Sequence, residues 1–416
     1  MSWGGVTRAR RGVVGLFNPA VGLFGAKARE GIIEFCRELI RIPSLPQQEG
    51  ALAEAIRARM VDLGYDEAWI DDAGNVIGRV GDGGGPAILF DGHLDTVGVT
   101  DASQWRHDPF GGEVEDGQIY GRGTSDMKGS LAAMVYAAGS LVPEKSRLRG
   151  TVYVCGSVCE ELVEGPGLGR AIQKVKPDYV VIGESSSLNL QIGQRGRAEI
   201  LLETTGQPAH SSSPWLGVNA VEKMVFLLPA LKKILMPRDP LLGSALMELT
   251  DIISRPYPGI SMVPDQCLAT FDRRLMAGET PEGVIQAVDD VIVALARDDP
   301  ELRAKVSIAE ARFKTYTGYQ ISVPKFAPAW KLPEEHFLVM TALGALREAG
   351  LTPDTGAYAF CTNGSYSAGK YRIPTVGFGP GNEVQAHTID EYIEVKNLVR
   401  GAEGYRAIAR AVCGAA

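Results

Sequence analysis

Three side chains that could bind or support a metal ion follow one apolar run. The run at residues 87–90 reads AILF, and Asp91, His93 and Asp95 come just after it. Ionisable groups beyond the carboxyl end of a buried strand stand where open α/β sheets bind ligands. His93 would bind a metal through one ring nitrogen while Asp95 held the other, which fixes the tautomer. Taken alone, the His-x-Asp motif is also explained by a turn with a solvated Asp and a hydrogen-bonded core histidine.

Carboxylates or imidazoles stand at four other places where a predicted strand ends or a predicted helix begins. Glu160 and Glu161 follow the apolar strand predicted at residues 150–157. Adjacent residues point in different directions, so one carboxylate can bind a metal while the other faces a water beside it. Individually, the remaining candidates are also explained by a helix cap or by solvated loops. They are Asp126 in GRGTSDMKGS, Glu184 after DYVVIG and His387 after TVGFGPG.

Considered together, these candidates predict one site with two metal ions. Two histidines and four acids would converge on one edge of a parallel sheet, whereas unrelated placement would scatter them over both ends. Oxygen-rich ligation with one histidine per metal suits Zn, Mn or Co, and no cysteine competes for the role. Five candidate ligands exceed the three protein ligands of a single catalytic zinc. They suit two metals about 3.5 to 4 Å apart, with Asp126 shared between them.

The elements that must position these residues follow an α/β pattern. Strand-like runs alternate with segments of helical periodicity, which predicts an α/β fold with a doubly wound mixed sheet. After Arg195 the pattern changes to strand, helix, strand, helix, which predicts an inserted α+β domain that serves as lid and dimer surface. The predicted divisions are an N-terminal extension at 1–26, the catalytic domain at 27–197 and 317–416, and the insert at 198–316.

The composition is that of a globular protein that acts on small molecules. The chain has 416 residues, 45% of them hydrophobic, and a formal net charge of -8 at pH 7. An acidic chain lacks the dense Lys and Arg surface that nucleic-acid binding requires. Six cysteines are scattered without a C-x-x-C pair. This usage is typical of reduced thiols in a cytosolic protein, and we expect no disulfide.

The first 25 residues differ in composition from the rest of the chain. Arg8, Arg10 and Arg11 precede the apolar stretch GVVGLFNPAVGLFG, an order that has the outline of a secretory signal. Asn18 and Pro19 interrupt the stretch, which is also too short to span a bilayer as a helix. We therefore expect a disordered extension on a cytoplasmic protein, without membrane association, and export is the less favoured alternative.

The motifs around the candidate ligands resemble those of one hydrolase family. They are GHLDTV at 92–97, YGRGTSDMKG at 120–129, CEE at 159–161, GES at 183–185, GQPAHSS at 206–212, DRR at 272–274 and Ala-His at 386–387. In order and spacing they resemble the M20 family of metallopeptidases and deacylases, which includes acetylornithine deacetylase and succinyl-diaminopimelate desuccinylase. Within that family the chain looks most like the YgeY-type hydrolases, through GQRGRAEI at 193–200, CTNGSYSAG at 361–369 and GFGPGNEVQAH at 377–387.

The resemblance assigns roles to the candidate residues. It implies that Asp95 orients His93 and that Glu160 is the general base, which takes a proton from the bridging water and returns it to the departing amine. It also implies two metal sites that share one carboxylate. The first is His93, Asp126 and Glu184, and the second is Asp126, Glu161 and His387.

Three further positions would contact the substrate if the resemblance holds. His210 matches a lid histidine that stabilises the oxyanion, often from the partner subunit. Arg274 matches an arginine that holds a substrate carboxylate, with Arg273 as its nearest competitor. Asn363 lies where relatives carry a Gly-rich substrate loop. The chain departs from the common pattern at Ser130 and at residues 362–364, which leaves the substrate's identity open.

These inferences predict a zinc-dependent di-metal amidohydrolase. It would form a homodimer through the insert and cleave an N-acyl amino acid or related small amide by attack of a bridging hydroxide, with Co or Mn as alternative metals. A dipeptidase or carboxypeptidase of the same fold is the nearest alternative, because it needs only a different pocket. A metal-binding relative without activity is disfavoured by the intact Glu160. A serine hydrolase built on Ser211 to Ser213 is disfavoured because these serines lack a nucleophile-elbow context.

Overall fold

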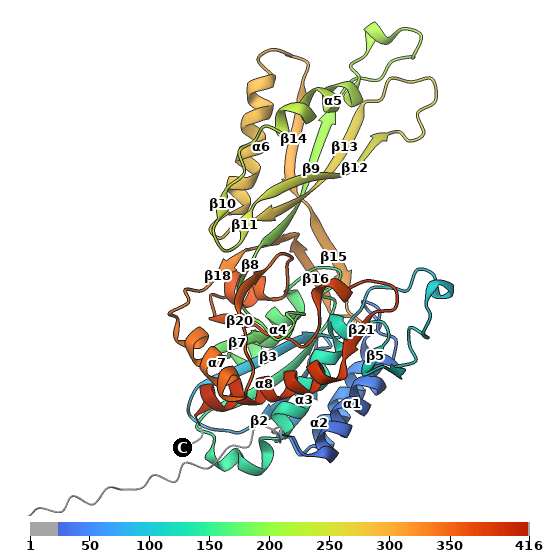
Figure 1. Ribbon diagram of the computed structural model, residues 1–416. Coiled ribbons are helices and arrows are strands. Elements are labelled where there is room, and N and C mark those ends of the chain that lie inside the picture. Colours follow the sequence, from blue (N-terminus) through green and yellow to red (C-terminus); the bar gives the residue numbers. More distant parts are fainter. Residues whose placement is uncertain (1–23, 415–416) are drawn as a thin grey trace, which may run out of the picture.

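Figure 1 shows two bodies joined by a narrow connection in the computed structural model, which describes residues 24–414. The larger body carries both ends of the described chain, and the middle of the sequence forms the smaller one. The extension predicted at 1–26 lies, up to residue 23, outside the described residues, and α1 (Ala26–Ile40) begins at its predicted end. Within the described part, no helix combines the length and the apolar character needed to cross a bilayer.

A nine-stranded mixed sheet forms the centre of the larger body. Its strands lie in the order β1 (Glu67–Ile70), β2 (Val76–Val80), β6 (Thr151–Ser157), β3 (Ala87–His93), β7 (Tyr179–Ile182), β20 (Thr375–Gly377), β8 (Leu190–Gln194) and β18 (Trp330–Lys331), and β19 (Thr355–Tyr358) pairs with β8 outside this path. The neighbouring strands β6, β3, β7 and β20 are parallel, whereas β2 and β8 flank them in antiparallel orientation. The parallel strands therefore end at one common edge.

Helices cover both faces of this sheet. Along β3, Ile88 and Phe90 point to one side and join a cluster with residues of α1, α2 (Gly50–Asp62), α3 (Gly129–Gly139), α7 (Phe337–Glu348) and α8 (Val395–Cys413). Leu89 points to the other side and packs in a cluster with Leu168 and Ile172 of α4 (Pro166–Val175). Burial on both faces explains why this part of β3 is a continuous apolar run in the sequence.

The smaller body, which we call the lid domain, is an antiparallel sheet covered by two helices. Its strands lie in the order β12 (Leu246–Arg255), β13 (Gln266–Leu275), β9 (Gly196–Thr205) and β14 (Arg303–Ile308), and β17 (Phe326–Ala327) also pairs with β9. Buried residues alternate along β9 and β13 and pack with α5 (Ala220–Leu231) and α6 (Pro281–Leu295). The predicted fold class, a mixed α/β sheet with an inserted α+β domain, is confirmed.

The strand pairing places the limits of the lid sheet slightly outside the predicted insert. The sequence predicts an insert at 198–316, whereas β9 begins at Gly196 and β17 ends at Ala327. The hairpin of β15 (Glu310–Lys314) and β16 (Gln320–Pro324) precedes β17, and a second hairpin is formed by β10 (Arg238–Asp239) and β11 (Gly243–Ser244). The pairing of β17 with β9 joins segments far apart in the chain, so no local pattern predicts it.

A small third sheet joins two segments beside the candidate site. It consists of β21 (Tyr392–Glu394), β5 (Gln118–Tyr120) and β4 (Val114–Glu115), all antiparallel. Tyr392 pairs with Tyr120, so the segment after His387 lies against the segment before Asp126.

All six cysteines are among the described residues and all are free thiols, as the sequence predicts.

Candidate functional site

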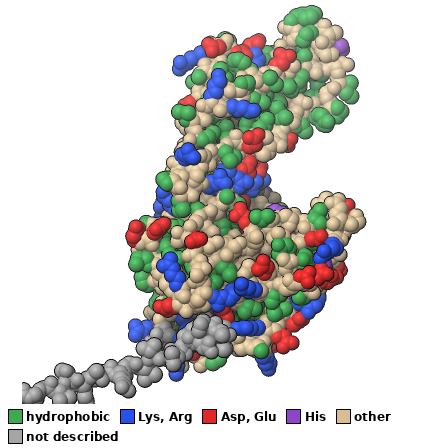
Figure 2. Space-filling view, viewed as in Figure 1, with side chains coloured by type: hydrophobic (Ala, Val, Ile, Leu, Met, Phe, Trp, Pro, Cys, Tyr) green, Lys and Arg blue, Asp and Glu red, His purple; other side chains and the backbone are tan. Residues whose placement is uncertain are grey.

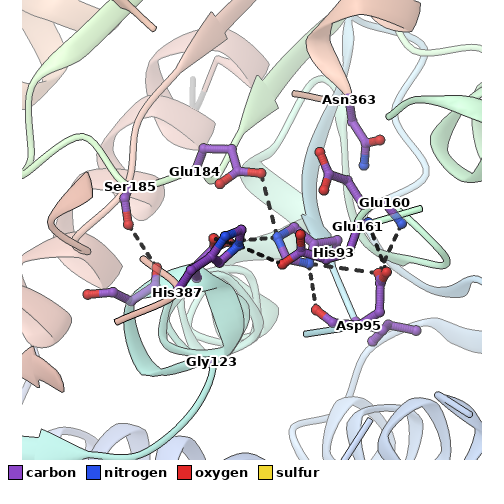
Figure 3. Close-up of polar contacts among 12 residues, drawn as sticks. His93, Asp95, Gly123, Glu160, Glu161, Glu184, Ser185, Asn363 and His387 are labelled. Atoms are coloured by element: carbon purple, nitrogen blue, oxygen red, sulfur yellow. Dashed lines mark hydrogen bonds and ion pairs between the residues drawn. The ribbon is translucent and has the colours of Figure 1, made fainter. Parts of the chain in front are cut away.

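The candidate residues from distant parts of the chain meet at the carboxyl edge of the parallel strands. His93 is the last residue of β3, Glu160 and Glu161 follow β6, Glu184 follows β7, and His387 comes after β20. Because β6, β3, β7 and β20 are neighbours in the sheet, their ends bring these side chains together (Figure 3). All of these side chains except that of His93 border a cavity of about 480 Å³. Its lining includes Asp126, Glu160, Glu161, Glu164, Glu184, Arg197, Arg274, Phe360, Cys361 and His387.

Asp126 stands between the two histidines and presents one oxygen to each. Its Oδ1 lies 2.9 Å from His93 Nε2 and its Oδ2 lies 3.2 Å from His387 Nε2. Glu184 Oε1 is 3.6 Å from His93 Nε2, and Glu161 Oε1 is 3.1 Å from His387 Nε2. These contacts form two donor groups, one around each imidazole, with Asp126 common to both. The groups overlap, because donor atoms of His93, Asp126 and Glu161 lie within 4.8 Å of one another, as do those of His93, Glu160 and Glu184.

The acids of this cluster strongly perturb one another. Burial, together with the charge of Asp126, raises the pKa of Glu184 to about 8. Burial and the nearby carboxylates of Glu184 and Glu161 raise the pKa of Glu160 well above its ordinary value. Burial also acts against the charge on Asp126, but hydrogen bonds from His387 and His93 hold its pKa well below its usual range. Such a concentration of buried negative charge requires positive charge at the same place.

The donor set fits divalent metal ions. The two groups combine imidazole nitrogen with carboxylate oxygen, the donors that Zn, Co and Mn accept in proteins. The second ring nitrogen of His93 is also fixed, because Nδ1 lies 2.7 Å from the backbone carbonyl of Asp95. A ligand histidine held through its other nitrogen has a defined tautomer and orientation.

Asp95 contacts the site differently from what the sequence predicts. The expected partner of His93 is the Asp95 carboxylate, but its Oδ1 is 3.8 Å from His93 Nδ1, and the backbone carbonyl takes the short contact. The carboxylate instead accepts hydrogen bonds from the backbone N–H groups of Glu160 and Glu161, at 3.0 and 2.9 Å. Asp95 thereby fixes both adjacent glutamates relative to His93.

The strand that carries His93 is longer than its apolar run suggests. The sequence predicts a strand that stops before Gly92, whereas β3 continues to His93 by pairing with Gly156 and Ser157 of β6. A Cβ atom at Gly92 would lie 2.8 Å from Met127 Cε and 2.9 Å from Leu131 Cδ2. Any larger residue here would force Met127 and Leu131 to shift, so close packing within the strand accounts for this glycine, and it does not mark a turn.

The loop that carries Asp126 is held by a glutamate that the sequence analysis missed. Asp126 lies in a turn before α3, with φ of -127° and ψ of 88°, and not in the first helical turn as expected. Glu391 is fully buried and accepts hydrogen bonds from the N–H groups of Gly123, Ser125 and Asp126 at 3.1, 2.8 and 3.1 Å. The only sequence signal is an acid shortly after His387, in the segment IDEY.

Arg274 lines the cavity, whereas its competitor Arg273 does not. Arg273 is buried on the opposite face of β13 and contacts Glu279. A second arginine, Arg197 on β9, also lines the cavity. The sequence analysis did not single out Arg197, because it lies in a strand pattern that packing alone would explain.

Two predicted substrate contacts do not line this cavity within the chain. His210 lies exposed on a lid-domain loop, where its Nδ1 accepts a hydrogen bond from the Ser212 backbone N–H at 3.1 Å. Asn363 is buried, and its Nδ2 donates to Asp91 Oδ2 at 3.0 Å and to Ser157 Oγ at 2.9 Å. Its amide oxygen accepts from the Gly165 N–H at 2.6 Å. With its amide fully engaged, Asn363 supports the loops around the cavity.

Comparisons with known proteins identify the family. The model of "Peptidase family M20/M25/M40" matches residues 89–411. The uncharacterized protein YgeY of Escherichia coli strain K12 is 34% identical over 380 residues, which cover 90% of this chain and 92% of YgeY. The succinyl-diaminopimelate desuccinylase of Beijerinckia indica is 27% identical over 403 residues, which cover 89% of this chain and 95% of that enzyme.

A solved structure agrees with these relatives in fold. The YXEP protein of Bacillus subtilis, described as a dinuclear metal-binding peptidase of the M20 family, matches with a TM-score of 0.71 at 14% identity, over 94% of this chain and all of its own. The resemblance predicted from the motifs, including that to YgeY, is confirmed. The chain belongs to the peptidase family M20/M25/M40 and is a hydrolase that acts on C–N bonds.

Proposed function

We propose that the protein is a di-metal amidohydrolase that cleaves an N-acyl amino acid or a related small amide. The position of Asp126 carries this proposal, because its two oxygens face His93 Nε2 at 2.9 Å and His387 Nε2 at 3.2 Å. A carboxylate between two imidazoles is the arrangement that a pair of metal ions sharing one ligand requires. The name of the desuccinylase relative, which denotes removal of an acyl group from an amine, supports the same reaction.

His93, Asp126 and Glu184 would hold one metal, and Asp126, Glu161 and His387 the other. The mixed nitrogen and oxygen donors favour zinc, with cobalt or manganese as alternatives. When bound, the two ions would polarise the substrate carbonyl and lower the pKa of the attacking water.

Glu160 would be the general base. Its carboxylate lines the cavity beside the proposed ligands but belongs to neither set, and Asp95 fixes its backbone. Burial and the neighbouring carboxylates raise the pKa of Glu160, which makes it a better proton acceptor than an ordinary glutamate. Glu160 would take a proton from the attacking water and deliver it to the amine as the C–N bond breaks.

A homodimer would complete the site. The edge strand β12 exposes Leu246, Ile252 and Ile253, and α5 exposes Val225 and Phe226. Exposed apolar side chains on an edge strand favour association with another chain. In such a dimer, His210 of the partner subunit would stabilise the oxyanion of the tetrahedral intermediate, since His210 lies outside the cavity of its own chain.

A dipeptidase or carboxypeptidase is the second candidate. The metal ligands and the base would be unchanged, and only the group on the acyl side of the scissile bond would differ. The YXEP protein of Bacillus subtilis, which has a similar fold, is described as a peptidase, and this favours the alternative.

Hydrolysis of a substrate panel tests the proposal. Metal-loaded full-length protein is incubated with N-acetyl and N-succinyl amino acids, dipeptides and C-terminal peptide substrates, before and after treatment with EDTA. We expect hydrolysis of at least one N-acyl amino acid, lost on chelation and restored by added metal. Cleavage of peptides alone would favour the peptidase, and activity that EDTA leaves intact would refute the metal mechanism.

A further inference from the structure

Two arginines of the lid domain lie side by side at the cavity. Arg197 on β9 and Arg274 on β13 are directly paired across the two antiparallel strands, and both line the cavity. Like charges at directly opposed positions destabilise a sheet. Figure 2 shows Lys and Arg side chains gathered where the two bodies meet, beside the hollow between them.

Asp272 contacts both guanidinium groups at their Nε atoms. Its Oδ2 accepts a hydrogen bond from Arg197 Nε at 2.8 Å, and its Oδ1 lies 2.9 Å from Arg274 Nε. Among residues 24–414, no acceptor engages the Nη atoms of Arg274, and Arg197 Nη1 has only Glu164 Oε1 at 3.4 Å. Contacts through Nε fix each planar fork while its terminal N–H groups remain available to a ligand.

The terminal N–H groups of the two forks leave room for one carboxylate. Asp272 and Glu164 balance the charges of the two guanidinium ions, but Glu164 reaches Arg197 from the larger body at 3.4 Å, which is longer than a good charge-assisted bond. A carboxylate between the two forks would pair with N–H groups of both arginines. It would take the place of the Glu164 contact.

We propose that Arg197 and Arg274 together bind a single carboxylate of the substrate, so that Arg197 is a specificity-determining residue. This inference rests on the proposed function, because the N-acyl amino acids proposed as substrates carry a free carboxylate next to the scissile bond, and it adds Arg197 to the residues that bind this carboxylate. The competing explanation is that Arg197 only links the domains, through Glu164 on one side and Asp272 on the other.

Paired substrates separate the two explanations. The kcat/KM is measured for an N-acyl amino acid and for the same compound with its carboxylate replaced by a primary amide. Wild-type protein, Arg197→Gln and Arg197→Lys are compared, with Arg303→Gln on the exposed side of β14 as the matched control. We expect Arg197→Gln to lower the preference for the acid about 10- to 100-fold, as loss of a charge-assisted hydrogen bond predicts. Arg197→Lys should lower this preference less, and Arg303→Gln should leave it unchanged.

The results distinguish failure of this inference from failure of the proposed function. If Arg197→Gln lowers kcat/KM equally for the acid and the amide, Arg197 is a structural link and the inference is wrong, while the function stands. If wild-type protein hydrolyses neither compound, the function fails, and calorimetric titration with the same pair of compounds tests the arginines alone. If wild-type protein binds the acid more tightly than the amide and Arg197→Gln does not, the inference is supported. If wild-type protein binds the acid and the amide equally, the inference is overturned.

Discussion

Arg122 and Glu391 form a buried ion pair that connects the backbones of two proposed metal ligands. Arg122 Nη1 lies 2.6 Å from Glu391 Oε2, and Arg122 Nη2 donates to the carbonyl oxygen of His387 at 3.4 Å. Glu391 Oε1 in turn accepts from the N–H of Asp126 at 3.1 Å. This salt bridge therefore links the Asp126 loop to the His387 loop, in addition to the pairing of β21 with β5.

Replacement of Glu391 should weaken metal binding. In Glu391→Gln, the amide presents an N–H₂ group to backbone donors that now face a carboxylate, so the Asp126 loop loses hydrogen bonds. Changes of residues that support metal ligands typically lower metal affinity about 10- to 100-fold. Calorimetric titration of metal-free protein with zinc measures the change. Glu394→Gln, at an exposed position in β21 three residues after Glu391, is the control, and equal affinities in the two variants would contradict the role of Glu391.

Glu160→Gln should abolish turnover while the protein keeps its metal. The side chain retains its size but cannot accept a proton, and loss of a general base typically costs about 100-fold or more in rate. Metal content by elemental analysis and kcat on the best substrate are measured together. Glu161→Gln is the matched comparison, because a proposed ligand should lose metal as well. Turnover that survives in Glu160→Gln would show that another group is the base.

Metal binding should release a proton from His387. Hydrogen bonds with Asp126 and Glu161 raise the pKa of His387 from 6.5 to about 10 in the metal-free protein, and a metal ligand must be neutral. The pKa of His387 is higher in the folded protein than in the unfolded chain, so protonation of His387 stabilises the metal-free fold. This stabilisation is complete below pH 6.5 and is lost as the pH rises through about 10. Metal affinity should therefore increase with pH across this window.

Calorimetry in buffers of different ionisation enthalpy counts the protons released by the metal. Near neutral pH, His387→Ala should release about one proton fewer than wild-type protein. The same proton count in both proteins would show that His387 is neutral before metal arrives.

Gly92→Ala should destabilise the strand beneath the site. The added Cβ would lie 2.8 Å from Met127 Cε and 2.9 Å from Leu131 Cδ2, and overpacking of a core typically costs about 1 to 3 kcal/mol. Chemical unfolding measures the loss of stability. Gly84→Ala provides the control, because a Cβ there meets nothing within 4 Å. A Gly92→Ala variant as stable as Gly84→Ala would mean that Met127 and Leu131 move aside without cost.

The identity of the chemical groups could be read from the sequence alone. In the sequence, His93, Asp126, Glu161, Glu184 and His387 each stand near the end of a predicted strand or the start of a predicted helix, and parallel strands must end at a common edge. The alternation of strands and helices likewise predicts the layered fold, because each pattern can bury its apolar side chains in only one way. Local sequence therefore determined the fold class and which residues could meet at the sheet edge.

Only the tertiary structure decided how these groups are held and what surrounds them. The hydrogen bonds of Asp95 to Glu160, of Glu391 to the Asp126 loop and of Asp272 to Arg197 join segments that lie far apart in the chain or on different strands. The engagement of Asn363 by Asp91 and the exposure of His210 depend on packing in the same way. Such contacts arise when separate elements pack together, and they leave no periodic pattern in the sequence from which they could be predicted.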